Sequence, residues 1–459
     1  MLSRRRFLSH SCGLGVAAAT ASTTALTLGL TRSVAASTTD GYKALVCILL
    51  AGGNDSYNML LPYDQDQYDE YSKIRSDLAL GYDSLLPLSN KTEEGRSYAL
   101  HSGFDEIRQI YEAGDLAFVS NVGTLIEPVD AAAIRARTAK LPLGLFSHSD
   151  QIAQWQSVIS YRRSSSYGWG GRMADLLDPN PANGLSMNIS LSGTNLFQTG
   201  AKVNPYTIFN RGDGANTVWS FPELWSNGIN IHEVIRDLLD VEEENLLRRE
   251  YSRRLKGAMN NRDTIVNAIR SAPEFETQFS DNNFSATLRQ IARVIGARNV
   301  LGQDRQTFFV QYGGWDHHFN VIGYQESMLP ILSKGLDEFR SALQELGEFE
   351  NVVTFTISDF GRTLTSNGQG SDHGWGGHHM VMGSDVNGGS MYGSYPELSD
   401  SSPLDVGRGI YIPTTSVEQY FAELALWFGV SPSDLDEVLP AVRNFYSPDS
   451  SVAPLGFLV

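Results

Sequence analysis

The sequence predicts an α/β fold with a mostly parallel central sheet and helices on both faces. Short, almost uninterrupted apolar runs alternate with longer amphipathic stretches, which is the pattern of buried parallel strands joined by helices. Loops rich in Gly, Asn and Asp follow several of these runs directly. In open α/β sheets, ligands gather outside the carboxyl ends of the strands, so such loops are where a site is expected.

The first strand is expected over the apolar run 43–50, which leads into the polar sequence Gly52-Gly53-Asn54-Asp55. A helix over 103–112 and a second buried strand over 116–122 follow. The other expected strands are 186–191, 307–311 and 352–357, and the longer helices are 232–255, 285–295, 324–346 and 417–428.

The chain is expected to form one domain over 37–459, with an insertion around 192–300. The stretch 192–230 lacks strong periodicity and is rich in Gly, Asn and Pro. No internal repeat or low-complexity linker forces a domain boundary. Three polar loops, 54–55, 314–316 and 358–362, each follow an expected strand, and we expect them to converge on one site.

Residues 1–36 have the composition of a twin-arginine export signal. Ser3-Arg4-Arg5-Arg6-Phe7-Leu8 precedes an uncharged stretch, and small residues up to Ala36 suit a signal peptidase. A membrane anchor is the alternative, but Thr, Ser and Gly dilute the apolar stretch. We therefore expect export by the twin-arginine machinery to the periplasm or the medium, with no stable membrane insertion after cleavage.

Charge and cysteine content narrow the class of protein. The formal net charge of −17 falls to −21 without residues 1–36, which contain four arginines and no acidic residue. So acidic a protein repels phosphate backbones, so no nucleic-acid partner is expected, while a bound cation can still attract a small anion. Without Cys12 only Cys47 remains, in an apolar run, so we expect a buried thiol and no disulfide.

Five of the nine histidines lie between Gly313 and His379. They fall in two glycine-rich strings, 313–318 and 372–379, with Asp359 and Arg362 between them. Imidazoles and carboxylates in such turns suit a divalent metal, although tight turns also use Gly, Asp and His for their backbone tolerance. Zn fits the mixed donor set best, and Mn, Ca or Mg would fit if carboxylates dominate.

Four strings together resemble domain of unknown function family 1501, a bacterial group of twin-arginine-exported proteins placed in the alkaline phosphatase-like superfamily. The strings are Gly52-Gly53-Asn54-Asp55, Gly314-Trp315-Asp316-His317-His318, Ser358-Asp359-Phe360-Gly361-Arg362 and Asp372-His373-Gly374. The resemblance implies an alkaline phosphatase-like fold and a metal-dependent hydrolase of phosphate or sulfate esters. Its substrate would be a small anionic ester or a sulfated or phosphorylated carbohydrate.

The resemblance also implies metal ligands, matched position by position. Asp55 resembles the first ligand, Asp316 and His318 the middle pair, Asp359 the later acid and His373 the last histidine. One departure is serious, because Phe360 stands where the superfamily has a histidine. The second metal would then be absent or bound differently, with His148, His378 or Asp372 as a substitute donor.

The catalytic groups are less well defined. Ser147, Ser149 and Ser56 are candidate nucleophiles, although a serine beside an acid more often caps a helix or forms a turn. Water activated by the metal would need none of them. His148 is a candidate acid, metal ligand or positioning group, and Arg362 either clamps an anionic ester or pairs with a site carboxylate.

Two functions of different classes are therefore carried forward. The first is an exported metal-dependent hydrolase of phosphate or sulfate esters. The second is a non-catalytic, metal-stabilised envelope protein that binds carbohydrate or a partner protein, because Phe360 and the lack of a clear nucleophile weaken the hydrolase hypothesis.

Overall fold

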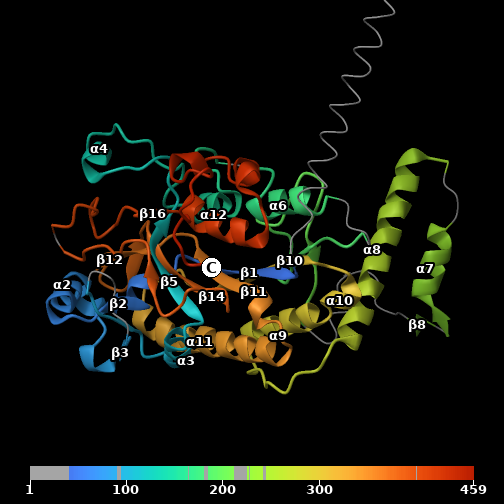
Figure 1. Cartoon of the computed structure of the whole chain (residues 1–459), viewed down its shortest axis with the longest axis horizontal. Coiled ribbons are helices and arrows are strands. Elements are labelled where there is room, and N and C mark those ends of the chain that lie inside the picture. The colour runs from blue at the N-terminus through green and yellow to red at the C-terminus, as the bar shows by residue number, and fades with distance from the viewer. Residues whose placement is uncertain are drawn as a thin grey trace, which may run out of the picture.

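A nine-stranded sheet forms the centre of the protein, which Figure 1 shows as a computed structural model. The structure describes residues 41–89, 95–163, 165–179, 184–210, 225–226, 228–240, 244–399 and 401–459. The strand order is β15-β5-β14-β11-β1-β10-β6-β7, and β16 also pairs with β5. These strands are β1 (Lys43–Ala51), β5 (Leu116–Gly123), β6 (Asn188–Ser190), β7 (Tyr206–Thr207), β10 (Arg305–Gly313), β11 (Val352–Ser358), β14 (Gly377–Met382), β15 (Met391–Tyr392) and β16 (Thr415–Ser416).

The sheet is mostly parallel, which confirms the predicted fold class. β14 runs antiparallel to both of its neighbours, β11 and β5, while the other described strand pairs in the sheet are parallel. The predicted strands 43–50, 116–122, 307–311 and 352–357 all lie within observed strands, and 186–191 is shortened to β6. β14 was not predicted.

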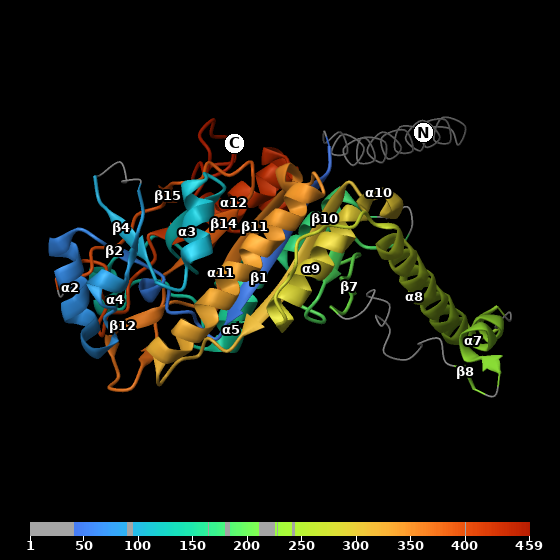
Figure 2. The ribbon, with the colours of Figure 1, turned by 90° about the horizontal axis from the view of Figure 1, so that it is seen from below.

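Helices cover both faces of the sheet, and the alternation of β1 side chains divides the core between them. Ala44, Val46, Ile48 and Leu50 pack with the helices on one face, and Leu45, Cys47 and Leu49 pack with those on the other. The first face carries α3 (Asp105–Glu112), α9 (Asn283–Gly296) and α11 (Val321–Glu345), and the second carries α5 (His148–Ser157), α6 (Trp169–Leu177) and α12 (Val417–Phe428), as Figures 1 and 2 show.

Smaller elements surround this body. The additional sheets are β2 (Leu60–Pro62) with β4 (Tyr98–Leu100) and β3 (Leu86–Pro87), the hairpin β12 (Arg362–Ser366) with β13 (Ser371–His373), and β8 (Trp225–Ser226) with β9 (Ile229–Asn230). The remaining helices are α2 (Gln65–Arg75), α4 (Ala131–Arg135), α7 (Ile231–Leu239), α8 (Leu246–Ser271), α10 (Arg298–Leu301) and α13 (Leu435–Val438).

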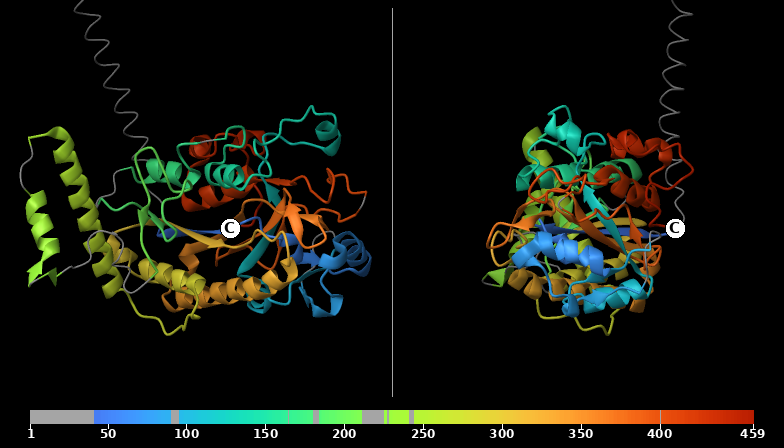
Figure 3. Two further views of the ribbon diagram at one scale, coloured as in Figure 1. Left: turned by 180° about the vertical axis from the view of Figure 1, so that it is seen from behind. Right: turned by 90° about the vertical axis from the view of Figure 1, so that its left-hand side faces the viewer.

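The predicted helix 232–255 is wrong as a single element. The chain leaves α7 after Leu239 and starts α8 at Leu246, because the Asn245 side chain accepts hydrogen bonds from the backbone N–H groups of Leu247 and Arg248. Within the predicted insertion, α9 lies under the sheet beside α11, whereas α7 and the first half of α8 project from the body (Figures 2 and 3).

Among the described residues, no helix combines the length and the apolar character that a bilayer-spanning segment needs. The predicted export signal, residues 1–36, lies outside the described part of the chain. Cys47 is a buried free thiol, as expected.

Candidate metal centre

The loops that follow β1, β10 and β11 begin side by side at the carboxyl edge of the sheet. β1 lies between the other two strands, and its last residues pair in register with theirs, Ala51 with Gly313 and Leu50 with Ser358. The loops at 52–55, 314–316 and 358–362 are therefore neighbours in space, as the sequence led us to expect.

Two glycines allow this close approach. A Cβ atom on Gly52, which has φ +124°, would lie 2.4 Å from the backbone nitrogen of Asp316. A Cβ atom on Gly53, with φ +80°, would lie 2.3 Å from the ring of Phe360. Only glycine combines these positive φ angles with the missing side-chain volume, so the pair is a packing requirement of the site.

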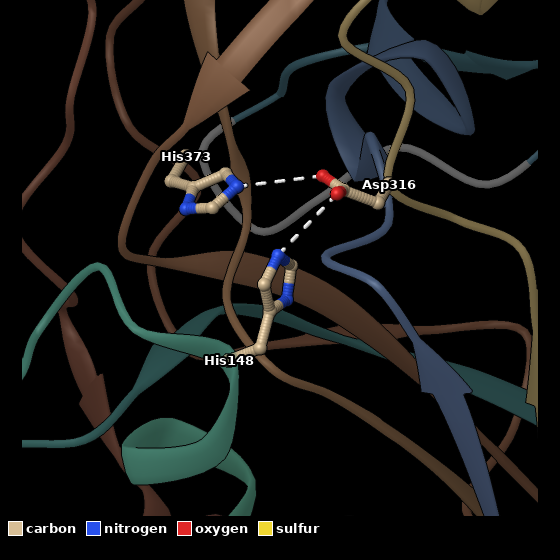
Figure 4. Close-up of side chains that lie close together, drawn as sticks. All are labelled: His148, Asp316 and His373. Carbon is tan, nitrogen blue, oxygen red and sulfur yellow. Dashed lines mark ion pairs between the residues drawn. The ribbon is translucent and has the colours of Figure 1, made fainter.

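The carboxylate of Asp316 is the centre of the candidate site. Figure 4 shows His148 and His373 pointing toward it from different segments. His148 Nε2 lies 3.5 Å from Asp316 Oδ2, and His373 Nε2 lies 3.4 Å from Asp316 Oδ1. These three side chains form a group of possible metal ligands among the described residues, with donor atoms that all lie within 4.8 Å of one another.

His318 adds a third imidazole to this arrangement. Its Nε2 lies 3.0 Å from Asp316 Oδ1 and 3.0 Å from His373 Nε2. The site therefore draws on the loop after β10, the start of α5 and the end of β13, which are far apart in the sequence.

Each of the three imidazoles has its other ring nitrogen bound to an acceptor. His148 Nδ1 lies 2.6 Å from a carboxylate oxygen of Asp359, His318 Nδ1 lies 3.3 Å from Asp372 Oδ1, and His373 Nδ1 lies 2.8 Å from the carbonyl oxygen of Phe146. Because an oxygen of this kind accepts, each Nδ1 donates, and in a neutral ring the lone pair then sits on Nε2.

Three Nε2 lone pairs consequently face the lone pairs of one carboxylate. Lone pairs that face one another repel unless a proton or a cation lies between them. Hydrogen bonding of the distal ring nitrogen to a carboxylate or carbonyl oxygen is the usual way in which proteins orient metal-binding histidines. A tetrahedral ion with bonds of about 2.0–2.2 Å has ligand atoms roughly 3.3–3.6 Å apart. The separations between Asp316 and each imidazole and between His318 and His373, 3.0–3.5 Å, are close to that spacing. The residues therefore fit a divalent cation.

The charge state of the cluster agrees with such a role. Burial by itself raises the pKa of Asp316, but the hydrogen bond and charge of Arg362, with His318 and His148, outweigh it and hold that pKa below its usual value. Burial is the main cause that lowers the pKa of His373. Asp316 is thus ionised and His373 neutral at pH 7, which are the forms that bind metal.

Arg362 is buried and committed to the protein. Its Nη1 donates to Asp316 Oδ1 at 2.8 Å and to the Gly52 carbonyl at 3.3 Å, and its Nη2 and Nε donate to Ser371. Of the two roles considered for Arg362, this geometry favours pairing with a site carboxylate over clamping a substrate.

Asp55 does not join the group of donor atoms identified among the described residues. Its carboxylate forms an ion pair with Arg75, and both side chains are fully buried. Arg75 also donates to the Thr363 carbonyl at 3.1 Å. Phe360 fills the neighbouring space with a ring whose centroid lies 4.4 Å from that of His373 and 5.0 Å from that of His148. The Arg75 guanidinium and the Phe360 ring thus occupy the space beside Asp55 and the site histidines in which a second metal ion would have to bind.

The three candidate nucleophiles have different surroundings. The Ser56 hydroxyl is 2% exposed and accepts a hydrogen bond from the backbone N–H of His378, so a substrate cannot reach it. Ser147 is the N-cap of α5, where its hydroxyl accepts from the Asp150 N–H and lies 3.2 Å from Ser149 Oγ. Ser147 directly precedes His148, at the edge of the cluster.

The remaining clustered histidines are buried away from solvent. His378 and His379 lie on β14, and burial lowers the pKa of each to about 3. His317 stacks on Tyr324 with ring centroids 5.1 Å apart. In these positions, none of the three histidines belongs to the group of donor atoms around Asp316.

The sequence analysis did not single out Arg408. Its guanidinium pairs with Asp372 and is 62% exposed, so a cationic group stands one side chain away from His318. Arg408 has φ +62° between Gly407 and Gly409, and that glycine-flanked, left-handed position was the available signal. Asn367 and then Arg408 lower the pKa of Asp372 to about 2, with His318 contributing less.

Comparison with known proteins identifies a family. A family model described as "Protein of unknown function (DUF1501)" matches residues 42–439. No curated protein matches the sequence with significant similarity.

Solved structures resemble the chain at low similarity. They include the sulfatase PsFucS1 from Pseudoalteromonas sp., with 9% identity over 87% of this chain and 71% of that one and a TM-score of 0.34. Wild type alkaline phosphatase PafA has 12% identity over 71% and 64%, with a TM-score of 0.29. The C-terminal periplasmic domain of EcEptC from Escherichia coli, in complex with Zn, has 11% identity over 91% and 92%, with a TM-score of 0.30. At these values, a function has to be argued from the site itself.

Proposed function

The chain belongs to the DUF1501 family of proteins of unknown function, and from the geometry of its site we propose that it is a metal-dependent hydrolase of phosphate or sulfate esters. One observation carries the proposal. His148, His318 and His373 each donate from Nδ1 to an oxygen acceptor and direct Nε2 toward Asp316.

These four residues would hold one divalent cation. Three imidazole nitrogens with one carboxylate suit Zn best, and Mn is the next candidate. Asp359 and Asp372 would then orient His148 and His318 rather than bind the ion, and Asp55 would be neutralised by Arg75. When bound, the cation would polarise an ester oxygen and offset the negative charge that develops on it.

The surroundings of the cluster supply groups for an anion. The first backbone N–H groups of α5 lack partners within the helix and lie beside His148, at the positive end of the helix dipole. Arg408, which pairs with Asp372, is exposed enough to contact a bound ester. Ser147, at the N-cap of α5, is partly exposed and directly precedes His148, so it is the candidate nucleophile that we favour. Hydrolysis breaks the P–O or S–O bond to the alcohol and adds the elements of water to the products.

Two exposed aromatic side chains favour an ester carried on a sugar ring. Phe146, whose carbonyl binds His373, is 45% exposed, and Phe319, which follows His318, is 55% exposed. Exposed aromatic rings beside a polar site offer apolar faces on which the C–H face of a sugar can pack. We therefore propose a sulfated or phosphorylated carbohydrate as the substrate class, acted on outside the cytoplasm after twin-arginine export.

The test combines metal analysis with turnover. Protein purified from its native host is analysed for bound metal and assayed with aryl phosphate and aryl sulfate esters. We expect about one divalent ion per chain and turnover of at least one ester. Bound metal and turnover should both be lost in Asp316→Asn. Both should be kept in the control Asp436→Asn, because Asp436 pairs with Arg443 at the surface.

Each other outcome is informative. Bound metal without turnover of any ester would contradict the hydrolase proposal and favour the alternative, a metal-stabilised binding protein. Absence of metal, with turnover unchanged in Asp316→Asn, would overturn the metal centre itself.

A further inference from the structure

A helical arm projects from the body of the protein (Figures 2 and 3). We define this arm as α7 together with residues 246–258 of α8. Beyond that point α8 packs against the body, where Met259, Ile265 and Ile269 are at most 2% exposed. Within 246–258, by contrast, every residue is at least partly exposed. The arm therefore contributes little to the core that holds the metal centre.

Ion pairs between its two helices hold the arm together as a hairpin. Arg236 on α7 pairs with Asp263, in the part of α8 that packs against the body, and Asp240, directly after α7, pairs with Lys256 in the arm. The order of these contacts shows that the helices run antiparallel. A hairpin fixed in this way presents a defined surface.

That surface is unusually apolar. Sixteen large hydrophobic side chains are exposed in the described chain, and six of them lie between Ile229 and Tyr251. On α7, Val234 and Leu238 are 43% and 66% exposed, and on α8, Leu247 and Tyr251 are 80% and 68% exposed. Each pair has the i, i+4 spacing that places side chains on one side of a helix. Leu247 and Tyr251 also line a shallow hollow with Arg248 and Ser252. Apolar surface concentrated in this way marks an interaction site.

The charges on the two helices are complementary. Glu233 and Asp237 on α7 and Arg248 and Arg249 on α8 are exposed, and no ion pair joins any of them to another described residue. Within the described part of the chain, α7 thus offers carboxylates, and the start of α8 offers guanidinium groups, that have no ion-pair partner. One hairpin carries both halves of a self-complementary surface.

We propose that the arm binds the arm of a second copy of this chain, forming a two-fold dimer in which α7 of each copy contacts α8 of the other. This pairing brings the two apolar stripes together and sets free acids against free arginines. A two-fold contact uses the same patch on both copies, as a self-complementary surface requires. Pairing α8 with α8 would instead set arginines against arginines. An anionic membrane would attract α8, but it would repel α7 and a chain with a net charge of −17.

Sedimentation velocity on the full chain tests the dimer. We expect a concentration-dependent dimer, with association weakened at least tenfold by Leu238→Glu and by Leu247→Glu. Val300→Glu is the matched control, because Val300 is also exposed, at 58%, but lies outside the arm. Unchanged circular dichroism and thermal midpoint in the arm variants would confirm that the body stays folded.

Charge reversal makes the test specific. Asp237→Arg alone should weaken the dimer, and the double variant Asp237→Arg with Arg248→Asp should restore it. A chain that stays monomeric at high micromolar concentration overturns the proposal, as does a dimer insensitive to the arm variants. Binding of the monomer to phosphatidylglycerol vesicles, lost in Leu247→Glu, would overturn it in favour of a membrane surface.

Discussion

A carboxylate oxygen of Asp359 lies 2.6 Å from Nδ1 of His148, which joins the loop after β11 to the start of α5. The other oxygen of Asp359 accepts a hydrogen bond from the Gly52 N–H at 3.0 Å. Asp359 is 1% exposed, so both contacts are shielded from water. This buried carboxylate fixes the orientation of His148 and thereby the direction of its Nε2 toward Asp316.

Asp359→Asn should weaken metal binding without unfolding the protein. The asparagine amide can donate to Nδ1, which would move the ring proton to Nε2 and remove the lone pair that faces Asp316. Loss of such supporting contacts typically lowers metal affinity about 10–100-fold. Competition with a chromogenic chelator measures that affinity. Asp385→Asn, which changes a carboxylate that binds Trp427, is the control. Equal affinity in Asp359→Asn and wild type would contradict the positioning role.

The sequence was sufficient to predict β1, β10 and β11 and the loop after β10, which carries Asp316 and His318. The apolar runs that became β1, β10 and β11 are continuous, because these neighbouring central strands are covered on both faces. The family resemblance implied that Asp316, His318 and His373 are metal ligands, and the structure brings their donor atoms within 3.4 Å of one another.

The sequence could not show which of the predicted carboxylates face Nε2 atoms and which hydrogen-bond to Nδ1 atoms of the site histidines. Asp359 and Asp372 were expected to bind metal, but both lie on Nδ1 atoms of site histidines. The difference is a matter of side-chain direction over a few ångströms. Asp55 poses the same problem, since its partner Arg75 lies at the end of α2 and nothing near Asp55 in the sequence indicates the pairing.

Breaking the Asp55–Arg75 pair should strongly destabilise the fold. In Arg75→Met the carboxylate of Asp55 stays buried without its partner, and removing one member of a buried pair typically costs about 3–5 kcal/mol. The double variant Asp55→Asn with Arg75→Met should recover much of that loss, because no unpaired charge remains. Urea unfolding measures both. Arg443→Met, which breaks an exposed pair with Asp436, should stay within about 0.5 kcal/mol of wild type. Equal effects of Arg75→Met and Arg443→Met would contradict this account.

Three buried histidines should make the protein sensitive to acid. Burial lowers the pKa of His378 and His379 to about 3 and that of His101 to about 4. Above about pH 6.5 these rings are neutral in both states, so their contribution to stability is fully present. As the pH falls below that value the unfolded chain takes up protons that the native state refuses, and each ring costs up to about 1.4 kcal/mol per pH unit.

His101→Asn isolates one of these rings. In wild type the Gly103 N–H donates a hydrogen bond to His101 Nδ1 at 2.9 Å, and Oδ1 of the introduced asparagine can accept that hydrogen bond instead. The free energy of unfolding, followed in urea between pH 7 and pH 5, should then fall less steeply than in wild type, by about one proton's worth of slope. Parallel curves for the two proteins would show that His101 does not resist protonation in the native state.

Glu418 should oppose stability at neutral and alkaline pH. It lies in the first turn of α12 with its carboxyl group fully buried, and burial raises its pKa to about 8, outweighing the opposing effects of its own backbone and of Ser416. Below about pH 4.5 the carboxyl group is protonated in both states, so Glu418 does not reduce the stability of the native state there. As the pH rises toward 8 the unfolded chain loses this proton while the native state keeps it, so stability falls by about 1.4 kcal/mol per pH unit.

The free energy of unfolding of Glu418→Gln should therefore match that of wild type near pH 4.5 and exceed it by roughly 2–4 kcal/mol at pH 8. Thermal and urea unfolding across this range, with the exposed Glu437→Gln as control, measure the effect. A constant difference between variant and wild type at every pH would show that Glu418 does not titrate abnormally.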